Sequence, residues 1–195
     1  MTTLLLVRHG ETDWNAEGRL QGHTDRPLSD YGRRQARELA GDLEDEELAA
    51  IYSSNLARAR ETAEIIGERL GLPVALDPDL REKDWGTWEG LNAVERDRVE
   101  FVGESTEAHQ ERMLRALRRI SERHPGDERV LVVTHGGSMR RVQTAAIGMA
   151  MPVVENCGRW LCACESGSFR TLDRASVEDY TRKYKPRLAI PVCGL

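Results

Sequence analysis

The stretch RVLVVTHGG, residues 129–137, decides the fold of this chain. It is a run of apolar and β-branched residues that ends in His135 and two glycines, which is the pattern of a buried strand followed by a loop. A second stretch of the same kind, LLLVRHG at residues 4–10, ends in His9 and Gly10. Ligands bind beyond the carboxyl ends of the strands in open α/β sheets, so both histidines stand where chemistry is expected.

Strand and helix patterns alternate along the rest of the chain. Further strands are expected at residues 49–53 and 73–76 and, as a hairpin around Ser166-Gly167, at 159–165 and 168–173. Helices are expected at residues 30–43, 56–70, 105–123 and 138–148. Ser29 is placed to cap the first of these helices, and Gly71 to end the second. The alternation predicts an α/β fold with a mostly parallel mixed sheet that is covered on both faces.

Length and charge narrow the class of protein. The 195 residues suit a single domain over 1–195, with a loose tail at 186–195. The formal net charge is −5, from 28 Lys and Arg against 33 Asp and Glu, which argues against a nucleic-acid partner held by bulk charge. No apolar run is long enough for a signal peptide or a membrane span, so we expect a cytoplasmic protein without a membrane partner.

The cysteines lie in the last quarter of the sequence. They are Cys157, Cys162, Cys164 and Cys193. A secreted domain held by disulfides is usually shorter and richer in cysteine, and a Cys-x-Cys pair without a nearby histidine is weak metal spacing. We therefore expect reduced structural thiols.

Two further stretches place polar side chains after predicted elements. The second strand ends in Ser53-Ser54 and leads into a helix that carries Arg58, and a later loop carries Arg81-Glu82. If these segments converge on His9 and His135, they form a pocket with two imidazoles, at least two guanidiniums and one carboxylate. This set suits phosphoryl transfer. A neutral imidazole can attack phosphorus, fixed cations neutralise the phosphoryl oxygens, and a carboxyl group protonates the leaving oxygen.

The order of these motifs resembles that of the histidine phosphatase superfamily, in its phosphoglycerate-mutase-like branch. The resemblance runs from residue 4 to about residue 149 and continues more weakly through Asn156. It rests on the following ordered boxes: Arg8-His9-Gly10-Glu11-Thr12 with Asn15, Gln21-Gly22, Ser53-Ser54 leading to Arg58-Ala59, Arg81-Glu82 leading to Trp88-Glu89-Gly90, and Thr134-His135-Gly136. The resemblance implies a three-layer α/β/α sandwich of the phosphoglycerate mutase-like kind.

The same resemblance implies a role for each matching residue. His9 takes the phosphoryl group and becomes a phosphohistidine, while Arg8, Arg58 and His135 bind the phosphoryl oxygens. Glu82 protonates the leaving group and then helps to activate water. The residues expected to line the same pocket are Asn15, Gln21, Gly22 and Gly136. No metal and no cofactor is implied, and the expected partner is a small phosphorylated metabolite.

Other histidines and arginines have ordinary interpretations. His109 and His124 are expected to be packed or surface residues of the long helix, and His23 is left open. Arg60 is expected to be a solvated neighbour of Arg58.

The proton donor has several candidates, because Asp84, Glu89 and Glu104 compete with Glu82. The resemblance favours Glu82, because it follows Leu80-Arg81 as the acid does in the family. Trp85 and Trp88 are expected to pack beneath the pocket.

The choice between phosphatase and mutase rests on Ala93 and the short segment 94–104. Mutases of the branch carry a lysine at the position of Ala93, and a shorter cover admits water to the phosphohistidine, which favours a phosphatase. Two alternatives stay open. One is a 2,3-bisphosphoglycerate-dependent phosphoglycerate mutase, in which Arg118-Arg119 or Arg140-Arg141 approaches a second phosphate. The other is an inactive regulatory module that binds a phosphorylated ligand.

The assembly state is not fixed by the sequence. The family resemblance is compatible with a homodimer. One candidate edge for an interface is the segment 152–165, which contains Trp160 and most of the cysteines.

Overall fold

The computed structural model describes residues 1–148 and 151–172, whose strands form one sheet. In chain order the strands are β1 (Thr2–Arg8), β2 (Leu48–Ser53), β3 (Val74–Leu76), β4 (Arg129–Thr134), β5 (Arg159–Glu165) and β6 (Ser168–Thr171). Their order across the sheet is β3-β2-β4-β1-β5-β6. Strands β1 to β4 pair in parallel, whereas β5 pairs antiparallel with both β1 and β6. The mostly parallel mixed sheet is therefore confirmed.

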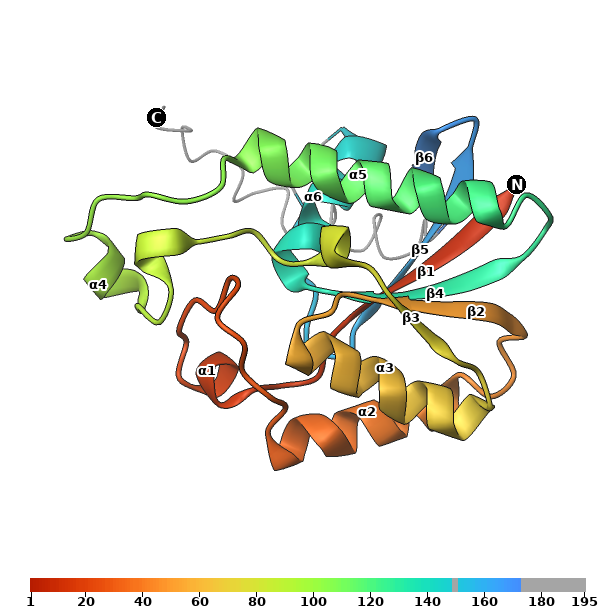
Figure 1. The fold of residues 1–195 in the computed structure, drawn as a ribbon, viewed down its shortest axis with the longest axis horizontal. Helices are drawn as coiled ribbons and strands as arrows, with labels where there is room; N and C mark the ends of the chain where they lie inside the picture. Colours follow the sequence, from red (N-terminus) through yellow and green to blue (C-terminus); the bar gives the residue numbers. More distant parts are fainter. Residues whose placement is uncertain (149–150, 173–195) are drawn as a thin grey trace, which may run out of the picture.

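Helices cover both faces of this sheet. The long ones are α2 (Asp30–Asp42), α3 (Ala57–Leu70), α5 (Thr106–Arg123) and α6 (Gly136–Ile147). Figure 1 shows α2 and α3 together on one face of the sheet and α5 and α6 on the other. Short helices lie in the connections: α1 (Asp13–Ala16), α4 (Ala93–Arg96) and the 3-10 helices η1 (Pro78–Leu80) and η2 (Gly86–Trp88). This is the three-layer α/β/α sandwich that the family resemblance implies.

The central strand β1 is buried on both faces, as its continuous apolar sequence predicts. Leu4 and Leu6 pack in one core cluster with side chains of α5 and α6, and Leu5 and Val7 pack in a second cluster with side chains of α2 and α3. Side chains alternate between the faces of a strand, so each face receives every second residue. Burying one such side chain contributes about 1.5–3 kcal/mol, which fixes β1 and its carboxyl end firmly.

The predicted helix ends agree with the structure to within one residue, except at the start of α6. The Ser29 hydroxyl accepts a hydrogen bond from the backbone N–H of Gly32, and Gly71 ends α3 in the left-handed conformation with φ +68°. Helix α6 begins at Gly136, two residues earlier than expected, because it follows β4 directly with His135 as its N-cap residue. The first turn of α6 therefore lies at the carboxyl end of the sheet, beside His135.

Several features were not predicted or were placed differently. The short helices α1, η1, η2 and α4 carry too few residues to show a hydrophobic period. The last strand ends at Thr171, and the tail 186–195 lies outside the described residues. Strand β5 has a paired strand on each side, so residues 159–165 are not the open edge suggested for the segment 152–165.

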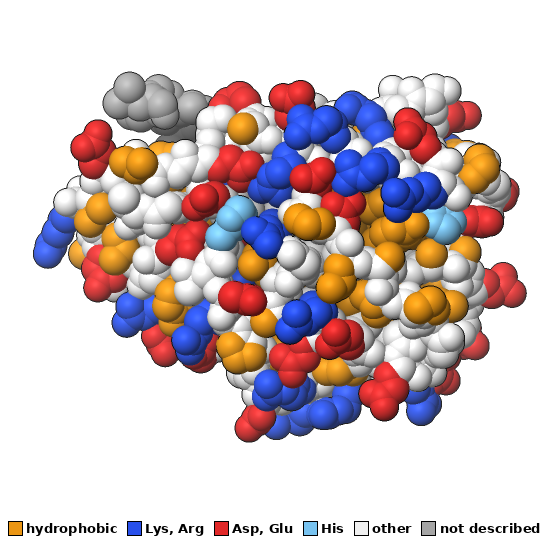
Figure 2. Space-filling model, in the orientation of Figure 1, with side chains coloured by type: hydrophobic (Ala, Val, Ile, Leu, Met, Phe, Trp, Pro, Cys, Tyr) orange, Lys and Arg blue, Asp and Glu red, His pale blue; other side chains and the backbone are white. Residues whose placement is uncertain are grey.

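The surface is charged and mixed. Figure 2 shows basic and acidic side chains interspersed over the face that α5 crosses, as expected for a solvated outer helix face. None of the helices in residues 1–148 and 151–172 is both long and apolar enough to cross a membrane.

The cysteines in the described part of the chain are free thiols, namely Cys157, Cys162 and Cys164. Burial raises the pKa of the Cys157 thiol to about 12, which keeps it protonated and unreactive near neutral pH. Cys193 lies outside the described residues.

Candidate active site

A cavity of about 240 Å³ lies at the carboxyl ends of β1 and β4. The residues that line it come from the end of β1, from α1 and the loop after it, from α3, from the loop after η1, from the first turn of α6 and from the segment before β5. They are Arg8, His9, Asn15, Arg19, Leu20, Gln21, Gly22, Arg58, Glu82, Trp85, Gly136, Gly137 and Val153. The cavity therefore lies at the end of the sheet where ligands of α/β proteins bind.

His9 and His135 meet because their strands are neighbours. Arg8 of β1 is paired with Thr134 of β4. The next residues, His9 and His135, therefore follow the two strands at the same level along the strand direction. The two imidazole rings lie 5.1 Å apart between centroids and cross edge-on at 61°. His9 is 3% exposed and His135 is completely buried.

The imidazole of His9 is held in one orientation by its own loop. Its Nδ1 lies 2.7 Å from the carbonyl oxygen of Gly10, so the proton is on Nδ1 and the lone pair is on Nε2. Burial, followed by the nearby charges of Arg58 and Arg8, holds the pKa of His9 well below its usual value of 6.5. His9 is therefore a neutral imidazole with a free lone pair at neutral pH.

His135 is also neutral. Burial is the main cause that holds its pKa well below 6.5, and the Arg58 charge adds to it. Its Nε2 lies 2.9 Å from the hydroxyl of Ser54, the residue that follows β2. Ser54 Oγ accepts the backbone N–H of Leu56 and has its own proton to donate to Nε2. When Ser54 donates to Nε2, the proton of His135 lies on Nδ1, as a donor.

Arg58 reaches the cavity from the first turn of α3 and is 1% exposed. Its Nη2 donates to the carbonyl of Gly22 at 2.7 Å, and its Nη1 donates to that of Thr24 at 3.1 Å. The carboxylate of Glu89 holds the same loop by accepting the backbone N–H groups of His23 and Thr24, both at 2.7 Å. Burial lowers the pKa of Arg58 to about 10, so it remains a cation at neutral pH.

Buried polar atoms without a partner gather in and beside this cavity. Within residues 1–148 and 151–172 there are few such atoms, and most of them belong to the site: Arg8 Nε, Arg58 Nε, His135 Nδ1 and Gln21 Oε1. Leaving a buried polar group unpaired is costly, and a native protein tolerates that cost where a ligand completes the bonding. Two guanidiniums and one imidazole N–H supply donors for an anion.

Glu82 is the carboxylate in the cavity. Its Oε1 accepts the backbone N–H of Lys83 and its Oε2 accepts that of Gly137, each at 2.9 Å. A Cβ at Gly137 would lie 2.5 Å from Glu82 Oε1, so a glycine is needed there for the carboxylate to approach α6.

The competing acids have other partners. Glu89 holds the loop at His23, and Glu104 pairs with Arg112 at 2.8 Å. Asp84 accepts the backbone N–H of Gly86. None of the three lines the cavity, which supports Glu82 as the one that can reach a ligand there.

The predicted site residues come together. All of them except His135 line the cavity, and His135 contacts the ring of His9 instead. Trp85 packs on Trp88 and Phe101 as expected, and it also lines the cavity with Leu20 and Val153. Trp88 stacks on Trp85 and contacts Phe101, as a packing residue does.

The sequence analysis did not identify several residues that line the cavity or hold the segment of Glu82. Leu20, Gly137 and Val153 lie in no motif with recognisable chemistry, and Arg112 looked like one more charge on the face of α5. Arg112 instead donates to the carbonyls of three residues around Glu82, namely Asp79, Arg81 and Glu82. The available signal was an arginine one helical turn from the inward-facing position of His109.

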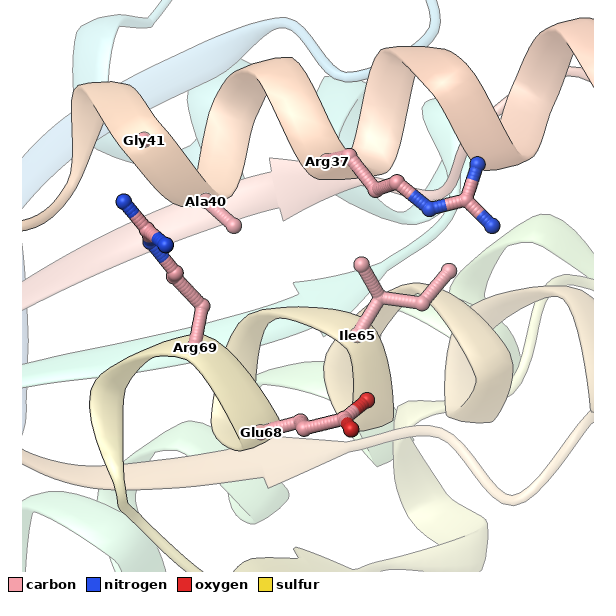
Figure 3. Close-up of a pocket in the computed structure, with 6 residues that line it drawn as sticks. All are labelled: Arg37, Ala40, Gly41, Ile65, Glu68 and Arg69. Atoms are coloured by element: carbon pink, nitrogen blue, oxygen red, sulfur yellow. The ribbon is translucent and has the colours of Figure 1, made fainter.

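A more voluminous surface hollow lies elsewhere. Figure 3 shows it between α2 and α3, where Arg37 and Arg69 flank a floor that includes Ala40 and Ile65. Its volume is about 570 Å³, but it is wide open and none of the predicted site residues lines it. Within the described residues, no group of three His, Cys, Asp or Glu side chains has the arrangement of a metal site.

Comparison with known proteins agrees with this site. The profile of the histidine phosphatase superfamily (branch 1) matches residues 4–166. The uncharacterized phosphatase PhoE of Bacillus subtilis (strain 168) is 36% identical over 185 residues, which cover 92% of this chain and 94% of PhoE. The metal-independent phosphoserine phosphatase of Arabidopsis thaliana is 38% identical over 161 residues, which cover 73% of this chain and 67% of that enzyme.

A solved structure shows the same fold. Bacillus stearothermophilus YhfR superposes with a TM-score of 0.81 at 36% identity, covering 88% of this chain and 96% of YhfR. Further relatives carry the names of phosphatases and of probable phosphoglycerate mutases. The chain therefore belongs to the histidine phosphatase superfamily, branch 1, as a phosphoric monoester hydrolase.

Proposed function

We propose that this protein hydrolyses small phosphorylated metabolites through a phosphohistidine on His9, without a metal ion. The observation that carries the proposal is the neutral His9 ring beside the unpaired donors of Arg8, Arg58 and His135. A lone pair and a cluster of fixed donors are what an attack on a phosphoryl group requires.

In the first step, Nε2 of His9 attacks phosphorus and the bond from phosphorus to the leaving oxygen breaks. Glu82 gives its proton to that oxygen. The proton of His9 stays on Nδ1 and is donated to the carbonyl of Gly10, which keeps the ring in place as the bond forms. Arg8, Arg58 and His135 neutralise the charge on the other phosphoryl oxygens.

In the second step, water attacks the phosphohistidine and passes a proton to the carboxylate of Glu82. The bond from phosphorus to Nε2 breaks, so His9 returns to its neutral form and phosphate leaves. Asn15, Gln21, Gly22 and Gly136 line the same cavity and complete the wall around the phosphoryl group.

The cavity favours a small monophosphate over a bisphosphate. A mutase would need an arginine pair to bind the second phosphate. The two candidate pairs do not line the cavity, namely Arg118-Arg119 and Arg140-Arg141. Arg119 is paired with Asp77 and Asp79. Arg19 lines the cavity, but its guanidinium bonds to Glu17 and to the carbonyl of Gly90. Within this set, the arginines of the two pairs lie outside the cavity wall, and the one arginine in the wall is already bonded elsewhere, which supports a substrate with one phosphate.

A panel of substrates tests the reaction class. We expect phosphate release from p-nitrophenyl phosphate and from small metabolites, among them phosphoserine, phosphoglycerates, sugar phosphates and α-ribazole phosphate, and the same rates after treatment with EDTA. Loss of activity on chelation contradicts the metal-free mechanism. Conversion of 3- to 2-phosphoglycerate faster than phosphate release identifies a mutase, and binding of phosphoesters without turnover identifies a regulatory module.

A variant of the nucleophile tests the covalent step. His9→Ala is expected to lose turnover by about 10⁴-fold or more and to form no acid-labile phosphoenzyme, because the other imidazole of the site, His135, does not line the cavity. His124→Gln, at the far end of α5, is the matched control and should keep full activity. Continued phosphate release by His9→Ala shows that another group is the nucleophile.

The homodimer and the cytoplasmic location remain part of the proposal. Light scattering of the purified chain tests the first, and the fractionation of cells that express the full chain tests the second. The free thiols of Cys157, Cys162 and Cys164 support a reducing compartment.

A further inference from the structure

A histidine that is not part of the reaction described above lies against Glu82. His109 belongs to α5, on the same stripe as the buried Met113, Ala116 and Ile120, and it is 2% exposed. An apolar residue would fill this position at no polar cost, whereas a buried imidazole needs a hydrogen-bond partner. The choice of a histidine here points to a task beyond packing.

The partner of His109 is Ser138 on α6. His109 Nε2 lies 2.9 Å from Ser138 Oγ, and that hydroxyl donates to the carbonyl of Arg81 at 3.2 Å. A hydroxyl has one proton, so Ser138 Oγ must accept from Nε2 when it donates to Arg81. Burial lowers the pKa of His109, which leaves a neutral ring whose single proton is on Nε2. The result is a directed chain from His109 through Ser138 to the backbone before Glu82.

The same segment is held from the next turn of α5. Arg112 donates to the carbonyls of Arg81 and Glu82, at 3.0 and 3.1 Å. Residues three apart share a helix face, so His109, through Ser138, and Arg112 both hold the backbone at Arg81. The carbonyl of Arg81 thus accepts from both α5, through Arg112, and α6, through Ser138.

His109 also lies next to the carboxyl group itself. Its Nε2 is 3.7 Å from Glu82 Oε1, too far for a hydrogen bond but close enough to limit where the carboxyl group moves. The other contacts of that group are backbone N–H groups, of Lys83 and Gly137. The imidazole therefore forms the inner wall behind the carboxyl group.

We propose that His109 is a positioning residue for Glu82. Acting through Ser138 and the carbonyl of Arg81, and by direct contact with Oε1, it holds the Glu82 carboxyl group where it can protonate the leaving oxygen. This inference rests on the proposed role of Glu82 as the proton donor. His109 does not touch the substrate, because it does not line the cavity.

The test compares ester substrates that differ in their need for an acid. An alkyl phosphate such as β-glycerophosphate has a poor leaving group, whereas p-nitrophenyl phosphate has a good one. We expect His109→Val to lower kcat on the alkyl ester about tenfold and on the aryl ester less than about twofold, with KM and the affinity for vanadate unchanged. His109→Gln, which keeps an N–H donor of similar reach, should recover most of the lost rate.

A second variant covers the case in which His109→Val does not fold. Ser138→Ala removes the same relay with little change in packing, and it should slow the alkyl ester selectively as well. Equal slowing of both esters by the two variants, or no slowing by either, overturns the inference. His124→Gln serves as the control on the same helix and should alter neither rate.

Glu82→Gln, measured in parallel, separates this inference from the proposed function. If Glu82→Gln is selective for the alkyl ester and the His109 and Ser138 variants are not, the inference fails and the proposed function stands. If Glu82→Gln slows both esters equally, the acid assignment fails and the inference fails with it. In the double variant, His109→Val should add nothing to the effect of Glu82→Gln, because the two changes act on one group.

Discussion

The imidazole rings of His9 and His135 lie 5.1 Å apart at the ends of neighbouring parallel strands, and both are neutral. Two cations at this separation would repel each other, and the guanidiniums of Arg8 and Arg58 stand close by. Burial and these positive charges favour the neutral form of both rings. His9 therefore keeps a lone pair available, and His135 keeps an N–H donor available, in a site built from positive groups.

The first prediction concerns acid stability. The pKa values of His9 and His135 are held well below 6.5 in the folded protein, whereas the unfolded chain binds protons near that pH. The contribution of the two neutral rings to the free energy of unfolding is complete above about pH 6.5. It is lost as the pH falls toward the folded pKa values, by at most about 1.4 kcal/mol per pH unit for each ring.

Urea unfolding in a phosphate-free buffer, between about pH 8 and pH 5, measures this slope. His135→Gln should reduce the slope by the share of one histidine. A free energy of unfolding that stays level over this range is the contrary result, and it would show that the rings accept protons without cost.

The second prediction concerns the proton donor. Glu82→Gln keeps the size of the side chain and removes its acid, so a poor leaving group departs as an unprotonated oxygen. We expect kcat on an alkyl phosphate to fall by about 10²-fold or more, and kcat on p-nitrophenyl phosphate to fall much less. Steady-state kinetics on both esters measure the ratio. A common factor for the two substrates would indicate that Glu82 is not the acid.

The third prediction separates two arginines on one helix. Arg58 holds the carbonyls of Gly22 and Thr24 with two nitrogens while its Nε stays free for a phosphoryl oxygen. Lysine keeps the charge and loses this fork, so Arg58→Lys should lower kcat/KM by about 10²-fold. Arg60, exposed and near Glu64 at 3.6 Å, is the matched control, and Arg60→Lys should change kcat/KM by less than about twofold. Similar losses in both variants would mean that charge alone matters.

The fourth prediction uses two glycines with opposite surroundings. A Cβ at Gly137 meets Glu82 Oε1 at 2.5 Å, so Gly137→Ala must displace the carboxyl group and should slow alkyl esters by about tenfold or more. A Cβ at Gly41 in α2 meets nothing within 4 Å, and Gly41→Ala should raise the free energy of unfolding by about 0.5–1 kcal/mol with unchanged kinetics. Thermal unfolding and the two-ester assay report on both variants. Full activity in Gly137→Ala would show that the carboxyl group does not need this close approach.

Local patterns predicted the parts of the fold that local physics controls. The apolar runs at β1 and β4, the cap at Ser29 and the glycine at Gly71 each depend on residues a few positions apart. The same is true of His9 and His135, which follow directly on buried strands. Their convergence required one more rule, that parallel strands end at one edge of the sheet.

Side-chain partners far apart in the sequence were beyond such reasoning. Glu89 is bound to His23, and Arg112 to the backbone of Glu82, across separations that only the packing of the layers closes. His109 is an intermediate case. Its place four residues before Met113 marks it as inward-facing, but the sequence does not show that its side chain contacts Ser138 and Glu82.

The sequence by itself determined the layered α/β fold, the strand ends that carry His9 and His135, and the family to which the chain belongs. It did so because hydrophobic period, capping and strand order act locally or follow general rules of chain topology. The family resemblance favoured Glu82 as the proton donor, but only the tertiary structure shows that Glu82 lines the cavity while Glu89 and Glu104 do not, and that Trp85 lines it too. Those outcomes depend on which surfaces of distant segments fit together, and the free energy of that fit is a property of the packed molecule.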